Sequence, residues 1–113
     1  MTDNTRRVVV TGLGIVSPVG SSIDKAWGNI KNGVSGIRKI SSFDASSFSV
    51  QISGSVTDFN ADDYITPKNQ KKMDTFIHYG IGASVMAIKD SGIEITDDNR
   101  DRIGISIGSG IGG

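Results

Sequence analysis

Residues 66–92, TPKNQKKMDTFIHYGIGASVMAIKDSG, constrain the fold of this chain more than any other part of its sequence. Their composition predicts one long helical region, either continuous or broken near Lys72. Thr66 suits the position that caps a helix start, and Pro67 suits the first helical position. Gly92 suits the left-handed conformation that commonly follows a helix end. These signals place both ends of the helical region.

The middle of this region, residues 76–88, carries no charged side chain apart from a protonatable His78. Its apolar residues fall on every side of a helix, a pattern typical of a buried helix. The segment is too short, and too rich in Gly, Ser and His, to span a bilayer. Each of its glycines costs about 1 kcal/mol relative to Ala, so we expect a surface of small residues that another element approaches closely. The residues of that surface are Gly80, Gly82, Ala83, Ser84 and Ala87.

Three lysines, Lys68, Lys71 and Lys72, gather at the start of the helical region. A solvated helix end is the simpler interpretation of most such clusters. The helix macrodipole, however, disfavours cations at a helix N-terminus. A basic cluster kept in an unfavourable position indicates an acidic binding partner.

The overall composition excludes several classes of function. The 12 basic and 12 acidic residues balance, so we expect no binding to nucleic acid or to a membrane surface. The absence of Cys excludes disulfides and a cysteine nucleophile within these residues, and the one His cannot form a metal site or relay alone. The polar start carries no signal peptide, so we expect a cytoplasmic protein. The sequence RIGISIGSGIGG stops within a Gly-rich turn, so we expect the opening part of a longer protein.

Hydrophobic periodicity predicts three strands in the rest of the chain. We expect a mobile tail over residues 1–5, followed by one domain segment over residues 6–113. The first strand is a continuous β-branched run and should be buried, whereas the other two alternate apolar and small or polar residues. The predicted strands are residues 7–13, 50–56 and 103–107.

A helix is predicted between the first two strands, beginning at Ser22 or Asp24 and ending before Gly33. In the long loop that follows, apolar side chains are expected to hold the chain to the body of the protein. They are Ile37, Ile40, Phe43 and Phe48. A short helical turn is expected to begin at Asn60 or Asp62. The order strand, helix, strand, helix, strand favours an α/β layered fold.

Two Gly-rich turns follow predicted strands, and neither fits a nucleotide-binding motif. After Gly-Leu-Gly at 12–14, the third glycine position of a dinucleotide loop is Ser17, and Pro18 pushes Ser17 away from helical geometry. A phosphate would meet no helix N-terminus there, so we interpret these glycines as structural. The turn at 108–113 lacks both the dinucleotide spacing and the Lys of a P-loop. It is either a turn for close backbone approach or a loop that borders a site.

Few single residues have the chemistry of a functional site. Ile111 is an isolated apolar side chain in a Gly-rich loop, which suits the lining of an apolar cavity. His78 has no acidic partner near it in sequence, so we interpret it as a core histidine with satisfied hydrogen bonds. Asp74 can bridge to Lys71, three residues earlier, in a structural role. Spacing and chemistry alone indicate no catalytic residue, cofactor site or metal site.

Five motifs in order resemble the opening of the β-ketoacyl-acyl-carrier-protein synthases, and they cover the chain from Arg6 to its end. The motifs are RVVVTGLGIVSPVG (7–20), SGI with FD (35–37 and 43–44), KMDTF (72–76), DSGI (90–93), and RIG leading to GSGIGG (102–113). SPVG, KMD and GIGG look more like synthase II than synthase I of this family. Polyketide ketosynthases share some of these motifs.

The resemblance implies a thiolase-like layered αβαβα fold, in which two similar halves pack together and the enzyme works as a homodimer. It implies an acyltransferase that joins acyl-carrier protein to malonyl-carrier protein by decarboxylative Claisen condensation in fatty acid elongation. In this family a cysteine holds the acyl group, two histidines assist decarboxylation, and backbone N–H groups stabilise the oxyanion. No separate cofactor is required.

This chain departs from the family pattern because it contains neither the cysteine nor the two histidines. We therefore expect residues 6–113 to be an incomplete N-terminal segment of a synthase domain, inactive alone. Two features carry over from the resemblance. Lys68, Lys71 and Lys72 match the basic patch that binds the acidic acyl carrier protein, and Ile111 matches a residue that lines the acyl-chain pocket.

Three functions stay open from the sequence. The first is a 3-oxoacyl-carrier-protein synthase. The second is a polyketide ketosynthase or a non-catalytic, chain-length-factor-like subunit, and the residue at the nucleophile position would separate these. The third is a stand-alone α/β binding module, although so small a piece could not cover a buried helix on all sides.

Overall fold

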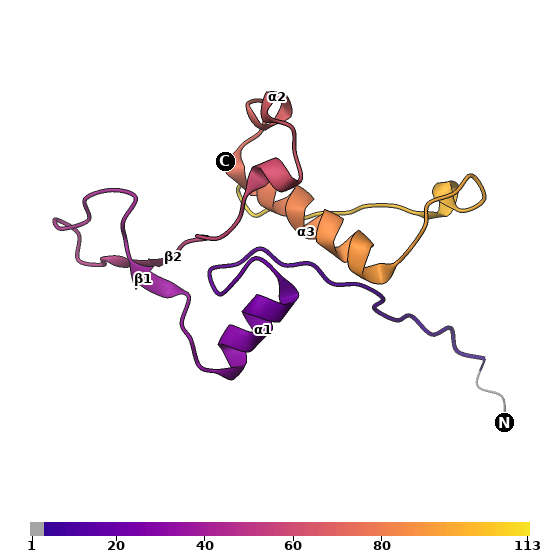
Figure 1. Cartoon of the computed structure of the whole chain (residues 1–113), viewed down its shortest axis with the longest axis horizontal. Coiled ribbons are helices and arrows are strands. Elements are labelled where there is room, and N and C mark those ends of the chain that lie inside the picture. Colours follow the sequence, from indigo (N-terminus) through magenta and orange to yellow (C-terminus); the bar gives the residue numbers. More distant parts are fainter. Residues whose placement is uncertain (1–3) are drawn as a thin grey trace.

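The computed structural model describes residues 4–113 and places one helix at its centre, with the other segments arranged around it (Figure 1). The helices are α1 (Ile23–Lys31), α2 (Pro67–Gln70) and α3 (Thr75–Ser91), and the 3₁₀ turns are η1 (Ala61–Asp63) and η2 (Arg100–Arg102). The strands β1 (Ile37–Lys39) and β2 (Ile52–Gly54) form an antiparallel pair. Most of the predicted tail, residues 1–3, lies outside the described residues. None of the described helices is long and apolar enough to cross a bilayer.

Helix α1 forms where the sequence predicts because its own neighbours satisfy its ends. The Ser22 side chain accepts a hydrogen bond from the Lys25 backbone N–H at 3.3 Å. Asp24 in the first turn and Lys31 in the last turn both complement the helix macrodipole. Gly33 follows with a φ of +67°, a conformation that suits glycine at a helix end.

The predicted long helical region is divided into α2 and α3, so a break near Lys72 is confirmed. Pro67 opens α2 directly after Thr66, although the Thr66 side chain makes no capping hydrogen bond. Residues 71–74 form the turn between the two helices. Gly92, with a φ of 66°, ends α3 as predicted.

The small-residue surface of α3 is confirmed, and the N-terminal segment packs against it. A Cβ at Gly12 would collide with the Ala87 carbonyl oxygen, and one at Gly14 would collide with the Ala83 carbonyl group. The closest approaches are therefore between backbones. These two glycines of the sequence Gly-Leu-Gly allow the chain to lie directly on α3, which agrees with their structural interpretation.

An aromatic cluster joins α3 to the loop that precedes η1. The Phe59 ring stacks on Tyr64 with ring centroids 5.5 Å apart, and it meets Tyr79 of α3 edge-on at 5.3 Å. A Cβ at Gly82 would collide with the Phe59 ring. The absence of a side chain at Gly82 therefore allows the Phe59 ring to pack directly against the backbone of α3.

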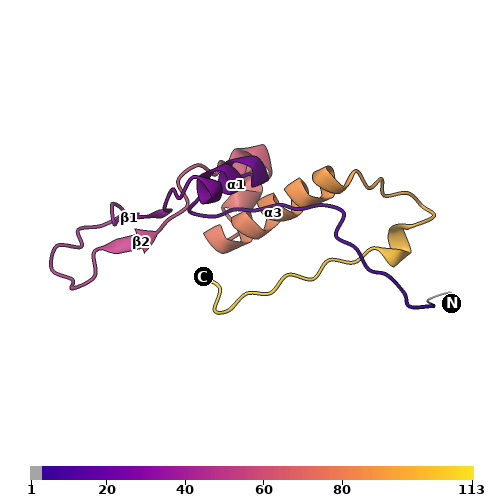
Figure 2. The ribbon, with the colours of Figure 1, turned by 90° about the horizontal axis from the view of Figure 1, so that it is seen from below.

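Two of the three predicted strands do not form within the described residues. Residues 7–13 and 103–107 run as extended segments without strand pairing (Figure 2). Val8 is 90% exposed and Ile105 is 74% exposed. The prediction of a buried strand at 7–13 is therefore wrong here, because a strand needs a neighbouring chain to accept and donate its backbone hydrogen bonds.

The strand predicted at residues 50–56 is confirmed in part, as β2, and the sequence did not predict its partner strand. β2 pairs with β1, with Ile37 opposite Gly54, and β1 lies within the predicted long loop. The predicted anchoring of this loop to the body is wrong, because Phe43 and Phe48 remain more than half exposed and contact each other edge-on at 5.8 Å. The hairpin instead contacts Pro18 through close approaches of Gly36 and Gly54.

The described residues cover α3 only in part, so its predicted burial within a larger protein stays a prediction. Gly82 is its only buried residue, and several large apolar side chains stay 36–42% exposed. These side chains are Phe76, Ile77, Val85 and Ile88. A chain of this size has too little surface to cover a helix that is apolar all round. The described residues do not form the predicted layered sheet.

Candidate functional site

The three predicted site lysines lie together on α2 and on the turn that follows it. Lys68 belongs to α2, while Lys71 and Lys72 lie in the turn, and all three side chains are exposed. Among the described residues, none of their ammonium groups forms an ion pair. We call Lys68, Lys71 and Lys72 the basic turn.

The prediction that these lysines oppose the dipole of the long helix is wrong, because the helix is broken between α2 and α3. The lysines do not lie at the N-terminus of the long helix, because α3 begins only at Thr75. Lys68 lies in the last turn of α2, where a cation is compatible with the helix dipole. The cluster is therefore notable for its density, with three exposed lysines within five residues and no ion pair to any of them among the described residues.

Asp74 does not pair with Lys71, so the predicted ion pair is wrong. Asp74 instead precedes the first residue of α3, and its side chain makes no capping hydrogen bond. Its backbone carbonyl accepts from the Ile77 N–H at 3.0 Å, which opens the helix. Lys71 is left available to a binding partner.

The side chain of Gln70 ties the basic turn to the preceding loop. Its Nε2 donates to Asp62 Oδ1 at 2.7 Å and to the Ile65 carbonyl at 2.8 Å. Ile65 is one of the buried apolar residues of the structure, at 7% exposure. The last residue of α2 is therefore fixed to a buried point.

The backbone of Gln70 ties the same turn to α3. Its carbonyl oxygen accepts from the Met73 N–H at 3.2 Å and lies 3.2 Å from His78 Nε2. Because a carbonyl oxygen only accepts, His78 Nε2 is the donor. His78 is half-buried and hydrogen-bonded, as its interpretation as a satisfied histidine predicts, although it is not in a closed core.

Ile111, the predicted pocket residue, is fully exposed. An apolar groove of about 370 Å³ lies nearby, between α3 and the extended chain before the Gly-rich loop. Its lining residues are Phe76, Ile77, Gly80, Ile81, Ile107, Gly108 and Ser109. The loop returns toward α3 at Gly112, which approaches the Phe76 ring. The loop therefore borders an apolar groove, but Ile111 does not line it.

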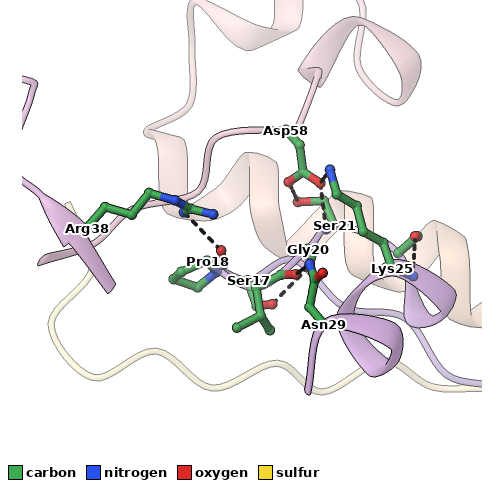
Figure 3. A network of polar contacts seen from close by, with 10 residues as sticks. Ser17, Pro18, Gly20, Ser21, Lys25, Asn29, Arg38 and Asp58 are labelled. Atoms are coloured by element: carbon green, nitrogen blue, oxygen red, sulfur yellow. Dashed lines mark hydrogen bonds and ion pairs between the residues drawn. The ribbon is translucent and has the colours of Figure 1, made fainter. Parts of the chain in front are cut away.

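A polar network around Asp58 links α1 to the loop that precedes η1 (Figure 3). The carboxylate accepts from Ser21 Oγ at 2.8 Å and from the Ser21 N–H at 3.2 Å, and it pairs with Lys25 Nζ at 2.7 Å. The hydrogen bonds from Lys25 and then from Ser21 lower the pKa of Asp58 to about 2. Ser21 and Asp58 are 37 residues apart, so no local pattern in the sequence indicates this pairing.

The turn beside this network is structural. Ser17 Oγ donates to the Gly20 carbonyl at 2.9 Å, and Arg38 of β1 donates to the Pro18 carbonyl at 3.3 Å (Figure 3). The Ser17 hydroxyl is thus engaged with backbone and has no base beside it. This geometry agrees with the rejection of a phosphate loop at 12–20.

Comparison with known proteins gives a consistent result over nearly the whole chain. Residues 5–113 match the family described as "Beta-ketoacyl synthase, N-terminal domain". The chain is 51% identical to 3-oxoacyl-[acyl-carrier-protein] synthase 2 of Vibrio harveyi, 48% to that of Vibrio cholerae and 44% to that of Staphylococcus aureus (strain N315). Each alignment covers 96% of this chain and 26% of the relative, so the chain spans about a quarter of the length of these curated relatives.

A solved structure described as "The ishigamide ketosynthase/chain length factor" is also similar to this chain. It superposes with a TM-score of 0.70 at 32% sequence identity. The superposition covers 83% of this chain and 23% of the solved chain.

Proposed function

The chain belongs to the β-ketoacyl synthase family, and from that premise we propose that its protein is a 3-oxoacyl-acyl-carrier-protein synthase of fatty acid elongation. The observation that carries this proposal is the 44–51% identity, over 96% of the chain, to three proteins named 3-oxoacyl-[acyl-carrier-protein] synthase 2. The proposed substrates are an acyl-carrier protein and malonyl-carrier protein.

The proposed reaction makes one carbon–carbon bond. The malonyl group loses its free carboxylate as CO₂, and the resulting carbanion attacks the carbonyl carbon of an acyl thioester held on a cysteine. The cysteine thiolate leaves, and the product is 3-oxoacyl-carrier protein, two carbons longer than the acyl group. Nucleophilic catalysis of this kind depends on an activated cysteine and on stabilisation of the oxyanion.

The 113 residues contribute binding groups to this reaction, and their catalytic partners are proposed to lie elsewhere in the protein. The chain has no Cys and one His, and that His is hydrogen-bonded to the backbone of Gln70. We therefore propose that the cysteine and both histidines lie beyond Gly113, and that the 113-residue chain is inactive alone. A thiolase-like layered αβαβα fold and a cytoplasmic homodimer complete the proposal on the strength of the family resemblance.

The basic turn is the proposed docking surface for the acyl carrier protein. Its three ammonium groups are exposed and have no ion-pair partner within the described residues, so their charge is available to an acidic protein. Exposed charges of this kind accelerate association and set specificity, and salt weakens their effect. Ile111 is the proposed acyl-pocket residue of the complete enzyme.

The test of the enzyme proposal uses the full gene product. The reading frame past Gly113 should encode a cysteine nucleophile and two later histidines. The purified protein should release CO₂ from malonyl-carrier protein and form the 3-oxoacyl product only when acyl-carrier protein is present. Replacement of the cysteine by Ala should abolish the product. A frame without the cysteine, or a protein with no condensation activity, overturns the proposal.

A second candidate is a non-catalytic, chain-length-factor-like subunit. The 32% identity to a structure described as a ketosynthase/chain length factor supports this candidate and a polyketide ketosynthase equally, and both over a stand-alone binding module. Such a subunit would carry another residue, such as Gln, at the nucleophile position and would co-purify with a catalytic ketosynthase. The higher identity to the synthase 2 proteins makes the enzyme the preferred proposal.

A further inference from the structure

We infer that Gln70 and His78 are positioning residues that hold the basic turn in the geometry that binds the carrier protein. This inference rests on the proposed function, because it assigns a role in that docking surface. Neither residue needs to touch the carrier. Both are half-buried, whereas Lys68, Lys71 and Lys72 are exposed.

The position of Gln70 makes it the junction of three elements. Its side-chain amide reaches back to Asp62 of η1 and to the Ile65 carbonyl. Its backbone N–H closes the first turn of α2 on the Thr66 carbonyl at 3.0 Å. Its carbonyl points forward to His78 of α3. A side-chain change at this residue therefore releases α2 from Asp62 and Ile65, while the backbone carbonyl that His78 contacts remains.

His78 supplies the only side-chain hydrogen bond that reaches the α2 backbone from α3 among the described residues. The four-residue α2 is too short to hold its conformation alone, since an isolated helix of this length is unstable in water. The turn that carries Lys71 and Lys72 starts directly at the carbonyl that His78 contacts. The hydrogen bond therefore limits how far the two ammonium groups can move relative to α3.

The position of the turn matters for binding because a flexible backbone loses conformational entropy when a partner orders it. A mobile turn would have to be ordered when the carrier binds, which weakens the complex. A turn already fixed by Gln70 and His78 presents its charges without that loss. Removing the side-chain hydrogen bonds of either residue should free the turn and weaken the Kd about three- to tenfold.

The test measures the Kd of acyl carrier protein for the full gene product and four variants at low salt. His78→Phe removes the donor and keeps an aromatic ring, and His78→Gln keeps an N–H donor at the same number of bonds from the backbone. Gln70→Met removes both side-chain hydrogen bonds at similar length. Lys71→Glu with Lys72→Glu tests the docking surface itself. Condensation from a small thioester that carries no carrier protein reports on the catalytic centre.

The expected result is a three- to tenfold weaker Kd for His78→Phe and Gln70→Met, with near-normal binding by His78→Gln. The rate with the small thioester should not change in these variants. If the double lysine variant loses binding but His78→Phe and Gln70→Met do not, the docking surface stands and the positioning inference is wrong. Equal losses in His78→Phe and His78→Gln also overturn it. Normal binding by the double lysine variant overturns both proposals.

If His78→Phe does not fold, Gln70→Met and His78→Gln still decide the inference. Amide hydrogen exchange over residues 71–74 then supplies the independent readout. Exchange in this turn should accelerate in Gln70→Met while exchange in α1 stays constant. An unchanged turn with a normal Kd would reject the positioning role.

Discussion

Side chains of the segment from Asp58 to His78 find polar partners within the described residues, whereas the extended segments 7–13 and 103–107 form no strand pairing. In the first, side chains of Asp58, Gln70 and His78 all find partners within the described residues. In the second, Val8 and Ile105 expose most of their surface, and no strand pairing forms. Both kinds of segment lie against the same central helix α3 (Figure 1).

This difference separates the part of the proposed function that near neighbours can supply from the part that needs distant segments. The proposed docking of a carrier protein needs a few charges on a short, hydrogen-bonded turn, and the described residues contain such a turn. A β-sheet and a condensing centre need partners from distant segments. The proposed docking surface therefore depends on hydrogen bonds between near neighbours, whereas the proposed chemistry depends on residues outside the described chain.

The first prediction concerns Gly14, which lies on α3 directly after the extended residues 7–13. Gly14→Val in the full gene product should destabilise the protein by about 3 kcal/mol or more, because its Cβ would overlap the backbone of Ala83. Equilibrium unfolding in urea measures the change. Gly28→Ala is the matched control, since nothing lies within 4 Å of its Cβ position inside α1. It should be neutral or stabilising by up to about 1 kcal/mol. A loss below about 1 kcal/mol for Gly14→Val would contradict close packing on α3.

The second prediction concerns the basic turn, within the segment from Asp58 to His78. Lys71→Glu with Lys72→Glu should weaken carrier binding about tenfold or more at low salt, and the loss should shrink as salt rises. Calorimetric titration at two ionic strengths measures both effects. Lys31→Glu with Lys39→Glu is the matched control, because it changes the net charge equally on α1 and β1. Equal losses in both double variants would reduce the basic turn to a general charge effect.

The sequence predicts the parts of this fold that depend on near neighbours. Ser22, Asn60 and Gly92 act on atoms within a few residues, and the helix ends and the turn that they predict are present. The buried strand at 7–13 was wrong because its partners are not local. The contact between Phe59 and Gly82 could be anticipated only as a small-residue surface without a named partner.

The candidate site shows the same division. The lysines can be selected from the sequence, but the dipole reason was wrong because the helix breaks before α3 begins. The bond between Gln70 and His78 spans eight residues across a turn, which no helical or strand period indicates. Ile111 was selected as an isolated apolar residue in a Gly-rich loop and by the resemblance, and its pocket role stays a prediction because its side chain is exposed among the described residues.

The third prediction concerns Ile111, in the Gly-rich loop that follows the extended residues 103–107. The change tested is Ile111→Phe, at a side chain that is fully exposed among the described residues. If Ile111 lines the acyl pocket of the full gene product, the same change should shift the preference toward shorter acyl chains by about threefold or more. The ratio of kcat/KM for long and short acyl-carrier substrates measures the shift. Ile95→Phe, on an exposed side chain elsewhere, should not change it. An unaltered ratio for Ile111→Phe removes this residue from the pocket.

The smallest predicted effect concerns Asp58, which links the loop before η1 to Lys25 of α1 and to Ser21. Its pKa of about 2 lies below the ordinary value of 3.8, so the folded state favours the carboxylate. The stability that this group contributes is complete above about pH 4 and is lost as the pH falls through 2. Because Lys25 is more than half exposed, solvent screening limits the contribution to about 1 kcal/mol or less. A side-chain carboxyl titration by NMR should give the low pKa, and Lys25→Met should raise it. A pKa near 3.8 in the unaltered protein would show that the link between α1 and the Asp58 loop does not persist in solution.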